Sequence, residues 1–242
     1  MKSILYSSHC DNLFQFNTIC KEQGFTDFVE FTAYEDILGI PIVFLINNTG
    51  IYISADGESL ITKDDKNYKL YSEILGFYDE HLIYTYKICK DFLDNAESIE
   101  YNEDKFQVNV YAKIYGGIYD HPDVPKIEGA IPLHAGKTEY PEYIPMNDLM
   151  VFDIEVNNSF LNFDVATQIC NEVGLDAGYE IHRGLLNSFV NKLELGLTNI
   201  PQRFGLPSIE NNEMYGIILR PIQTLEYNGE RLFLKKENKD YE

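Results

Sequence analysis

The sequence predicts an α+β protein built mainly from antiparallel sheets with flanking helices. Segments that alternate apolar and polar residues occur before, between and after segments with helical spacing, unlike the regular alternation of a parallel doubly wound sheet. The chain has 242 residues, of which 45% are hydrophobic and 14% aromatic, which is enough for one sizeable core. It contains no repeat, low-complexity tract or linker, so we expect residues 1–242 to form a single domain.

The N-terminal half is expected to hold a helix, a group of strands and a long helical stretch. A helix is predicted over 7–24, where apolar residues recur at helical spacing and Gly24 can end it. Strands are expected over 28–35, 41–47 and 51–53, with a hairpin turn at 47–50 and another turn at 56–57. Residues 68–93 predict one helix, or two helices broken near Gly76 or His81.

The C-terminal half is expected to alternate strands with shorter helices. Strands are predicted over 106–115, 149–156, 214–222 and 231–236, the last two joined through 228–229. Residues 118–148 contain five prolines and predict an ordered surface loop with a short hairpin. Helices are predicted over 164–173, capped by Asp164 and closed by Gly174, and over 185–195, closed by Gly196.

The net charge of the chain makes some classes of binding partner less favourable than others. The chain has 39 acidic and 19 basic residues, a net charge of −20, and it shows no basic stripe. Proteins that hold long nucleic acids need such a stripe to neutralise phosphates. We therefore expect a protein partner or a small nucleotide rather than an extended nucleic acid.

Cysteine spacing and hydropathy indicate the cytoplasm. The four cysteines, Cys10, Cys20, Cys89 and Cys170, are far apart and lack paired spacing, so we expect buried free thiols rather than a zinc site or disulfides. No apolar run approaches the roughly 20 residues that span a bilayer. The first residues lack the apolar centre of a signal peptide, and no membrane association is expected.

Six stretches occur in an order and spacing typical of one enzyme family. They are YEDILG at 34–39, KIYGGIY at 113–119, HPDVP at 121–125, VFDI at 151–154, YGIILRP at 215–221 and LKK at 234–236. From about residue 28 onward the chain resembles the covalent nucleotidyltransferases typified by phage RNA ligase 2 and the kinetoplastid RNA-editing ligases. The resemblance implies the catalytic-domain fold of ATP-dependent ligases, without the additional RNA-binding domain of a full ligase.

The resemblance also implies that the adenylylation site has been dismantled. In that family the first stretch reads Glu-Lys-x-x-Gly, and its lysine attacks the α-phosphate of ATP, which requires a nitrogen nucleophile. Here Asp36 occupies the position of that lysine. Other positions that carry charge in the family also differ: Ala55 replaces an arginine, Lys113 and Tyr215 replace glutamates, and Glu237 replaces one of two lysines. We therefore expect no catalytic residues and no magnesium or other metal site, because the oxygen ligands are missing.

Some positions that shape a nucleotide pocket remain. Phe152 matches the aromatic residue that stacks on adenine, while Arg220 and Lys235 match basic groups near the phosphates. The glycines that permit close backbone approach are Gly39, Gly116 and Gly216. Each has a simpler interpretation: Phe152 as a core aromatic, and the two cations as partners of the many acids. His121 is interpreted as a loop residue bonded to backbone rather than as a catalytic base.

Three functions remain open. The favoured one is a non-catalytic pseudo-ligase that binds a protein, a nucleotide such as ATP or AMP, or a nucleic-acid end. The second is an atypical RNA ligase or nucleotidyltransferase that uses a relocated lysine, Lys113 or Lys235. The third is a subunit kept for assembly only. Whether the chain is an enzyme therefore stays open, with the missing nucleophile favouring a negative answer.

The exchanged charges suggest an ion pair. The family's first lysine and third-motif glutamate lie on strands that line one pocket, and here Asp36 and Lys113 occupy their positions with opposite signs. We expect these two residues to pair and fill the place where ATP would bind. Two independent solvated side chains are the alternative.

Overall fold

The computed structural model describes residues 13–25, 28–57, 59–95, 102–133, 140–189, 193–227 and 230–238. The chain folds into two compact units whose segments alternate along the sequence. The first unit includes Ile40–Ile114 and Asp148–Ala177, and the second includes Leu5–Gly39, Tyr115–Asn147 and Gly178–Glu242, as far as these are described. That residues 1–242 form a single domain stays a prediction.

The first unit is built on a six-stranded sheet. Its strands are β2 (Ile40–Asn47), β3 (Gly50–Ser54), β4 (Gln107–Gly116), β5 (Asn147–Val156), β6 (Ser159–Phe160) and β7 (Asp176–Ala177). The order is β3-β2-β4-β5-β6, with β7 parallel to β5. The expected hairpin forms between β2 and β3, with Asn47 opposite Gly50.

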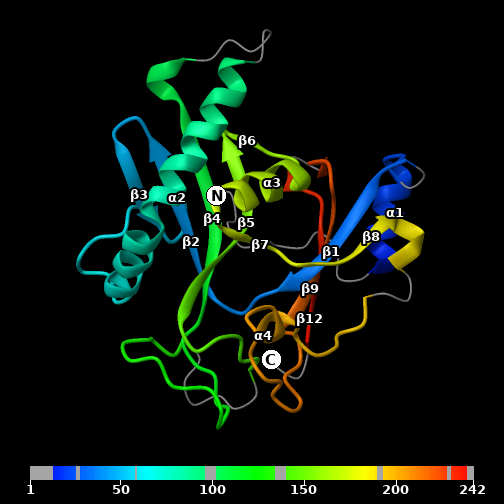
Figure 1. Cartoon of the computed structure of the whole chain (residues 1–242). Coiled ribbons are helices and arrows are strands. Elements are labelled where there is room, and N and C mark those ends of the chain that lie inside the picture. The colour runs from blue at the N-terminus through cyan, green and yellow to red at the C-terminus, as the bar shows by residue number, and fades with distance from the viewer. Residues whose placement is uncertain are drawn as a thin grey trace. The chain divides into compact units, whose positions relative to one another are not determined.

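Two helices pack in the first unit (Figure 1). They are α2 (Tyr68–Asp94) and α3 (Phe163–Val173), which contact each other, and α2 also contacts β2 and β3. A short 3₁₀ helix, η1 (Glu103–Lys105), precedes β4. The buried face of α2 consists of Leu70, Tyr71, Ile74, Tyr78, Leu82, Thr85 and Cys89. This spacing of three and four residues is the one that an amphipathic helix requires.

The second unit is built on a four-stranded antiparallel sheet in the order β12-β9-β1-β8. Its strands are β1 (Glu30–Asp36), β8 (Glu180–Leu185), β9 (Gly216–Pro221) and β12 (Leu234–Glu237), and a small hairpin pairs β10 (Glu226–Tyr227) with β11 (Glu230–Arg231). The helices are α1 (Leu13–Glu22), the 3₁₀ helix η2 (Leu186–Phe189) and α4 (Ile200–Arg203). Phe16, Ile19 and Cys20 of α1 share a hydrophobic core with this sheet.

Most predicted elements form. The 68–93 stretch is one continuous helix, which is one of the two predicted alternatives, without a break at Gly76 or His81. Three other details were wrong. Asn162, and not Asp164, stands at the N-cap of α3, although Gly174 closes the helix in a left-handed conformation as expected. No helix forms in the described part of 185–195 beyond the short η2, and the segment begins with the end of β8. No strand forms at 118–133 or 140–146, so the hairpin expected there is absent from the described part of the loop.

Several expectations reach beyond the described residues. Residues 7–12 of the first predicted helix, the 228–229 turn and Cys10 lie outside them. Cys20, Cys89 and Cys170 are buried, as predicted. Within the described ranges, no helix is both long enough and apolar enough to cross a bilayer.

Candidate functional site

The four-stranded sheet of the second unit has one apolar and one polar face. Side chains alternate between faces along a strand, and directly paired residues share a face. Ala33, Leu219 and Leu234 are paired across β1, β9 and β12, and all three belong to the buried core beside α1. The row of Asp36, Gly216 and Glu237 is three residues further along these strands and therefore lies on the opposite face.

A cluster of charged side chains occupies this polar face. Lys235 is two residues before Glu237 on β12 and so shares its face. The Nζ atom of Lys235 lies 3.0 Å from Oδ2 of Asp36 and 2.5 Å from Oε1 of Glu237. Asp36 is only 2% exposed, while the side chains of Lys235 and Glu237 are 21% and 40% exposed. One ammonium thus faces two carboxylates at the end of β1.

Tyr215 completes this cluster. Its hydroxyl oxygen lies 3.2 Å from Oε1 of Glu237 and donates to it, and its ring centroid lies 5.4 Å from the Lys235 ammonium. The neighbouring Gly216 leaves room between the strands, since a Cβ atom built there would lie 2.7 Å from the carbonyl oxygen of Lys236 and 3.5 Å from Cβ of Asp36. The close approach expected at Gly216 is therefore an approach to the chain's own backbone.

The two carboxylates control the protonation of Lys235. Burial by itself lowers the pKa of this ammonium, but Asp36 and Glu237 raise it, and the result is a pKa above the ordinary value for lysine. An amine must lose its proton before it can act as a nucleophile. Lys235 is therefore held in its charged, non-nucleophilic form at neutral pH.

Glu35 is a candidate residue that the sequence reasoning missed. It is 4% exposed, and its Oε1 atom has no hydrogen-bond partner among the described residues. Burial raises the pKa of this carboxyl to about 7, and Asp36 adds to the rise, while Thr198, the backbone of Asn199 and Arg203 lower it. Its position on the core face of an alternating strand was the available signal, because Ala33 two residues earlier is apolar.

The remaining cation of the predicted site is Arg220. It lies on β9 opposite Thr32 and is 2% exposed. Because it is four residues from Gly216 along the strand, it shares the polar face with Asp36. The second unit therefore contains Asp36, Tyr215, Arg220, Lys235 and Glu237 on or beside one sheet face.

Other predicted site residues belong to the first unit. Lys113 lies on β4 opposite Pro41 of β2, and the half-buried Phe152 of β5 has its ring centroid 6.4 Å from that of Tyr111. Ala55 lines a depression of about 370 Å³ together with Asp56, Asp64 and Asp65. Those carboxylates repel phosphate. The Asp36–Lys113 pair stays a prediction, since the two residues belong to different units.

Two smaller expectations concern loop residues. Nδ1 of His121 lies 3.2 Å from the backbone nitrogen of Asp123 and accepts its hydrogen bond, as the interpretation of His121 as a loop residue requires. A Cβ atom at Gly116 would lie 2.2 Å from the carbonyl oxygen of Met146, so this glycine also faces backbone. Gly39, which follows β1, is half-buried. Within the described ranges, no group of three or more His, Cys, Asp or Glu side chains is arranged to hold a metal ion.

Comparisons with known proteins identify the fold. No protein-family model matches the chain. No curated protein matches its sequence. Among solved structures, a mutant of Naegleria gruberi RNA ligase in its apo form matches with a TM-score of 0.55 and 10% sequence identity, over 100% of this chain and 58% of that chain. The chain has an RNA ligase nucleotidyltransferase fold.

Other forms of the same ligase agree with this fold. A mutant with AMP and Mn matches with a TM-score of 0.53 and 10% identity, and a mutant with ATP and Mn with 0.53 and 11%, each over 100% of this chain and 58% of that chain. At such identities the likeness establishes the RNA ligase fold and not an activity. The chain spans less than two thirds of the length of that ligase.

Proposed function

We propose that this chain is a pseudo-ligase of the phage RNA ligase 2 and RNA-editing ligase type, which acts by binding and not by catalysis. The observation that carries the proposal is the ion pair between Asp36 and Lys235, at the position where the resemblance expects a nucleophilic lysine. Its ligand is a protein partner, a nucleotide or a nucleic-acid end, and it works in the cytoplasm.

The chemistry of position 36 supports this proposal. A carboxylate is repelled by the triphosphate of ATP, and a mixed anhydride between Asp36 and AMP would hydrolyse readily. Lys235, which contacts Asp36, also contacts Glu237 and has a raised pKa. This amine is therefore not prepared to attack an α-phosphate.

The alternative is an active but atypical ligase with a relocated nucleophile. Lys235 was one candidate, and its pairing with two carboxylates weighs against it. Lys113 of β4 is the other candidate. An AMP adduct mapped to Lys113 would make the chain an enzyme.

Mass spectrometry of the intact protein after incubation with ATP and Mg²⁺ or Mn²⁺ tests the proposal. We expect no AMP adduct, while an RNA ligase with a lysine nucleophile, treated in parallel, acquires one. A stoichiometric adduct that is labile in acid and stable in alkali would overturn the pseudo-ligase proposal. Peptide mapping of such an adduct would show which lysine carries it.

Nucleotide preference provides a second test. Relative to the family, three basic side chains are lost at the phosphate end, at positions 36, 55 and 237, and two of these are now acidic. Each charge-assisted hydrogen bond contributes about 1.5–3 kcal/mol, so the affinity for a triphosphate falls by orders of magnitude. We expect AMP or adenosine to bind at least as well as ATP in calorimetry. ATP binding about tenfold tighter than AMP would contradict this arrangement.

A further inference from the structure

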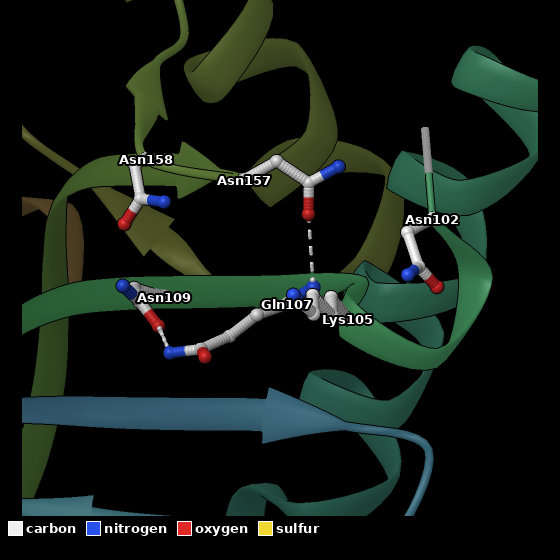
Figure 2. Close-up of a pocket in the computed structure, with 6 residues that line it drawn as sticks. All are labelled: Asn102, Lys105, Gln107, Asn109, Asn157 and Asn158. Atoms are coloured by element: carbon white, nitrogen blue, oxygen red, sulfur yellow. Dashed lines mark hydrogen bonds between the residues drawn. The ribbon is translucent and has the colours of Figure 1, made fainter. Parts of the chain in front are cut away.

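A polar cavity in the first unit lies apart from every motif position. It has a volume of about 250 Å³ and is lined by Asn102, Lys105, Gln107, Asn109, Asn157 and Asn158 (Figure 2). These residues come from η1 and its N-cap, the start of β4 and the turn between β5 and β6. The lining contains no carboxylate and no apolar side chain, which is unusual in a chain with a net charge of −20.

Backbone hydrogen bonds orient two of the asparagine side chains. Oδ1 of Asn157 accepts from the backbone nitrogen of Gln107 at 3.1 Å, and Oδ1 of Asn102 accepts from the backbone nitrogen of Asp104 at 3.0 Å. Only an oxygen can accept these bonds, so each amide has one orientation. The Nδ2 groups of Asn102 and Asn157 are therefore left as donors, and Figure 2 shows both side chains bordering the same space.

The remaining lining residues are three amides and one lysine, Lys105, which is the positive charge of the lining. Nε2 of Gln107 donates to Oδ1 of Asn109 at 2.6 Å, and Nδ2 of Asn109 donates to the buried Glu155 at 2.8 Å. Asn109 thus accepts one hydrogen bond and donates another. Lys105 makes no ion pair with any described residue. The cavity offers two oriented amide donors and one ammonium, with the amide of Asn158 beside them.

We propose that this cavity binds a phosphate-type oxyanion. A phosphate group presents mainly acceptor oxygens and a negative charge, and it matches the amide donors of Asn102 and Asn157 and the positive charge of Lys105. A sugar or another neutral polyol would not compensate the charge of Lys105. Glu155 is a carboxylate in the same hydrogen-bond network, and Asn109 lies between it and the cavity. The ligand is free phosphate or the phosphate group of a nucleotide.

An NMR titration of the whole chain with inorganic phosphate tests this site. The side-chain NH₂ signals of Asn and Gln report directly on the groups that would bind, and chloride is exchanged for phosphate at constant ionic strength. We expect saturable shifts at Asn102 and Asn157. Shifts that are linear in concentration, or that chloride alone reproduces, would overturn the proposal, because a chain of charge −20 has little general attraction for anions.

Isosteric variants make this test specific. Asn157→Asp keeps the oxygen that accepts from Gln107 and tolerates the left-handed backbone at φ 49, but it replaces the donor with a negative charge. We expect the dissociation constant for phosphate to rise about tenfold or more, and Lys105→Gln to weaken binding as well. Asn48→Asp, on an exposed turn, has the same charge change and should leave binding intact. Equal melting temperatures confirm that the variants fold, and unchanged affinity in Asn157→Asp would overturn the site.

AMP and adenosine distinguish the two sources of the oxyanion. If AMP shifts the Asn102 and Asn157 signals and adenosine does not, the cavity takes the phosphate of a nucleotide. If inorganic phosphate alone shifts them, the ligand is the free anion. Failure of all three probes would overturn this site without touching the pseudo-ligase proposal, which rests on Asp36.

Discussion

Asp36 is a buried carboxylate at the end of a strand, and Lys235 is one of the groups that compensate its charge. A buried ion pair is costly to desolvate, but removing one partner is costlier still, since the other charge is left without compensation. Asp36 is 2% exposed and lies 3.0 Å from Nζ of Lys235. At the scale of the residue, the carboxylate of Asp36 is part of an electrostatic cluster.

The first prediction concerns this pair. Lys235→Met should destabilise the protein by about 3–5 kcal/mol, because Asp36 stays buried without this counter-ion. Adding Asp36→Asn should recover much of the loss, so the two changes are not additive in urea unfolding. Lys69→Met removes an exposed pair with Glu73 and should cost no more than about 1 kcal/mol. Additive effects of Lys235→Met and Asp36→Asn would show that the pair contributes nothing.

The second prediction concerns the pH dependence that Glu35 contributes. Its pKa is raised from 4.5 to about 7 in the folded protein, so the folded state binds this proton more tightly than the unfolded state does. The contribution to stability is complete below pH 4.5 and is lost as pH rises through 7, by roughly 3 kcal/mol in total. Glu35→Gln should therefore be more stable than the wild type at about pH 8, with the difference disappearing near pH 4.

Denaturant unfolding between about pH 4 and 8 measures this difference directly. Taking wild type minus variant cancels the titration of all other groups. Glu172→Gln, at the exposed position next to the C-terminal end of α3, is the matched control and should follow the wild type throughout. A constant difference between wild type and Glu35→Gln over this range would show that Glu35 does not titrate there.

At the scale of the elements, Gly117 just after the end of β4 allows another backbone segment to pack close to the strand end, because glycine has no side chain. Gly117 follows β4 with φ 88, and a Cβ atom there would lie 2.1 Å from the carbonyl oxygen of Ile131. The side chain of Asn147 bonds both the nitrogen and the oxygen of Ile131, at 2.7 and 2.9 Å. The start of β5 and the end of β4 therefore clamp the proline-rich loop between them.

The third prediction tests that clamp. Gly117→Ala and Gly129→Ala both place alanine at a positive φ, of 88 and 87 respectively, and each should cost about 1–2 kcal/mol for that reason. A Cβ atom at Gly129 meets nothing within 4 Å, whereas at Gly117 it meets backbone. We expect Gly117→Ala to cost about 1–3 kcal/mol more, measured by thermal unfolding. Equal losses would show that the loop moves aside freely.

At the scale of the whole molecule, the strongly negative net charge opposes the binding of polyanions. With 39 acidic and 19 basic residues, long-range electrostatics oppose any polyanion, and local donors or one buried arginine cannot reverse this over many phosphates. We therefore expect the protein to bind no more of a nucleic acid than one end of its strand.

The fourth prediction follows at this scale. In fluorescence anisotropy at physiological salt, a single-stranded RNA of about 40 nucleotides should bind more weakly than about 10⁻⁴ M, the weak limit of non-specific binding. Lowering the salt should bring only a small gain. Affinity in the micromolar range that falls steeply with salt would contradict the prediction, and would show a basic surface that the composition does not reveal.

Sequence reasoning worked where the determinants are local, and it was wrong where distant segments compete. The turn of the β2–β3 hairpin and the closure of α3 at Gly174 follow from residues that are neighbours in the chain. At the start of the helix expected over 185–195, Leu185 instead pairs with Glu30 of β1, since such pairing overrides local helical spacing. Gly76 did not break α2, since a long buried face outweighs the roughly 1 kcal/mol cost of one glycine.

What the sequence by itself determined is the residue type at position 36: a carboxylate cannot act as an amine nucleophile, whatever surrounds it. Only the tertiary structure decided which partner Asp36 has, because β9 lies between β1 and β12 and brings Lys235 across the sheet. The burial of Glu35 and the orientation of the amides at Asn102 and Asn157 were decided in the same way. Residue type is a property of one position, whereas burial and pairing are properties of the packed sheets.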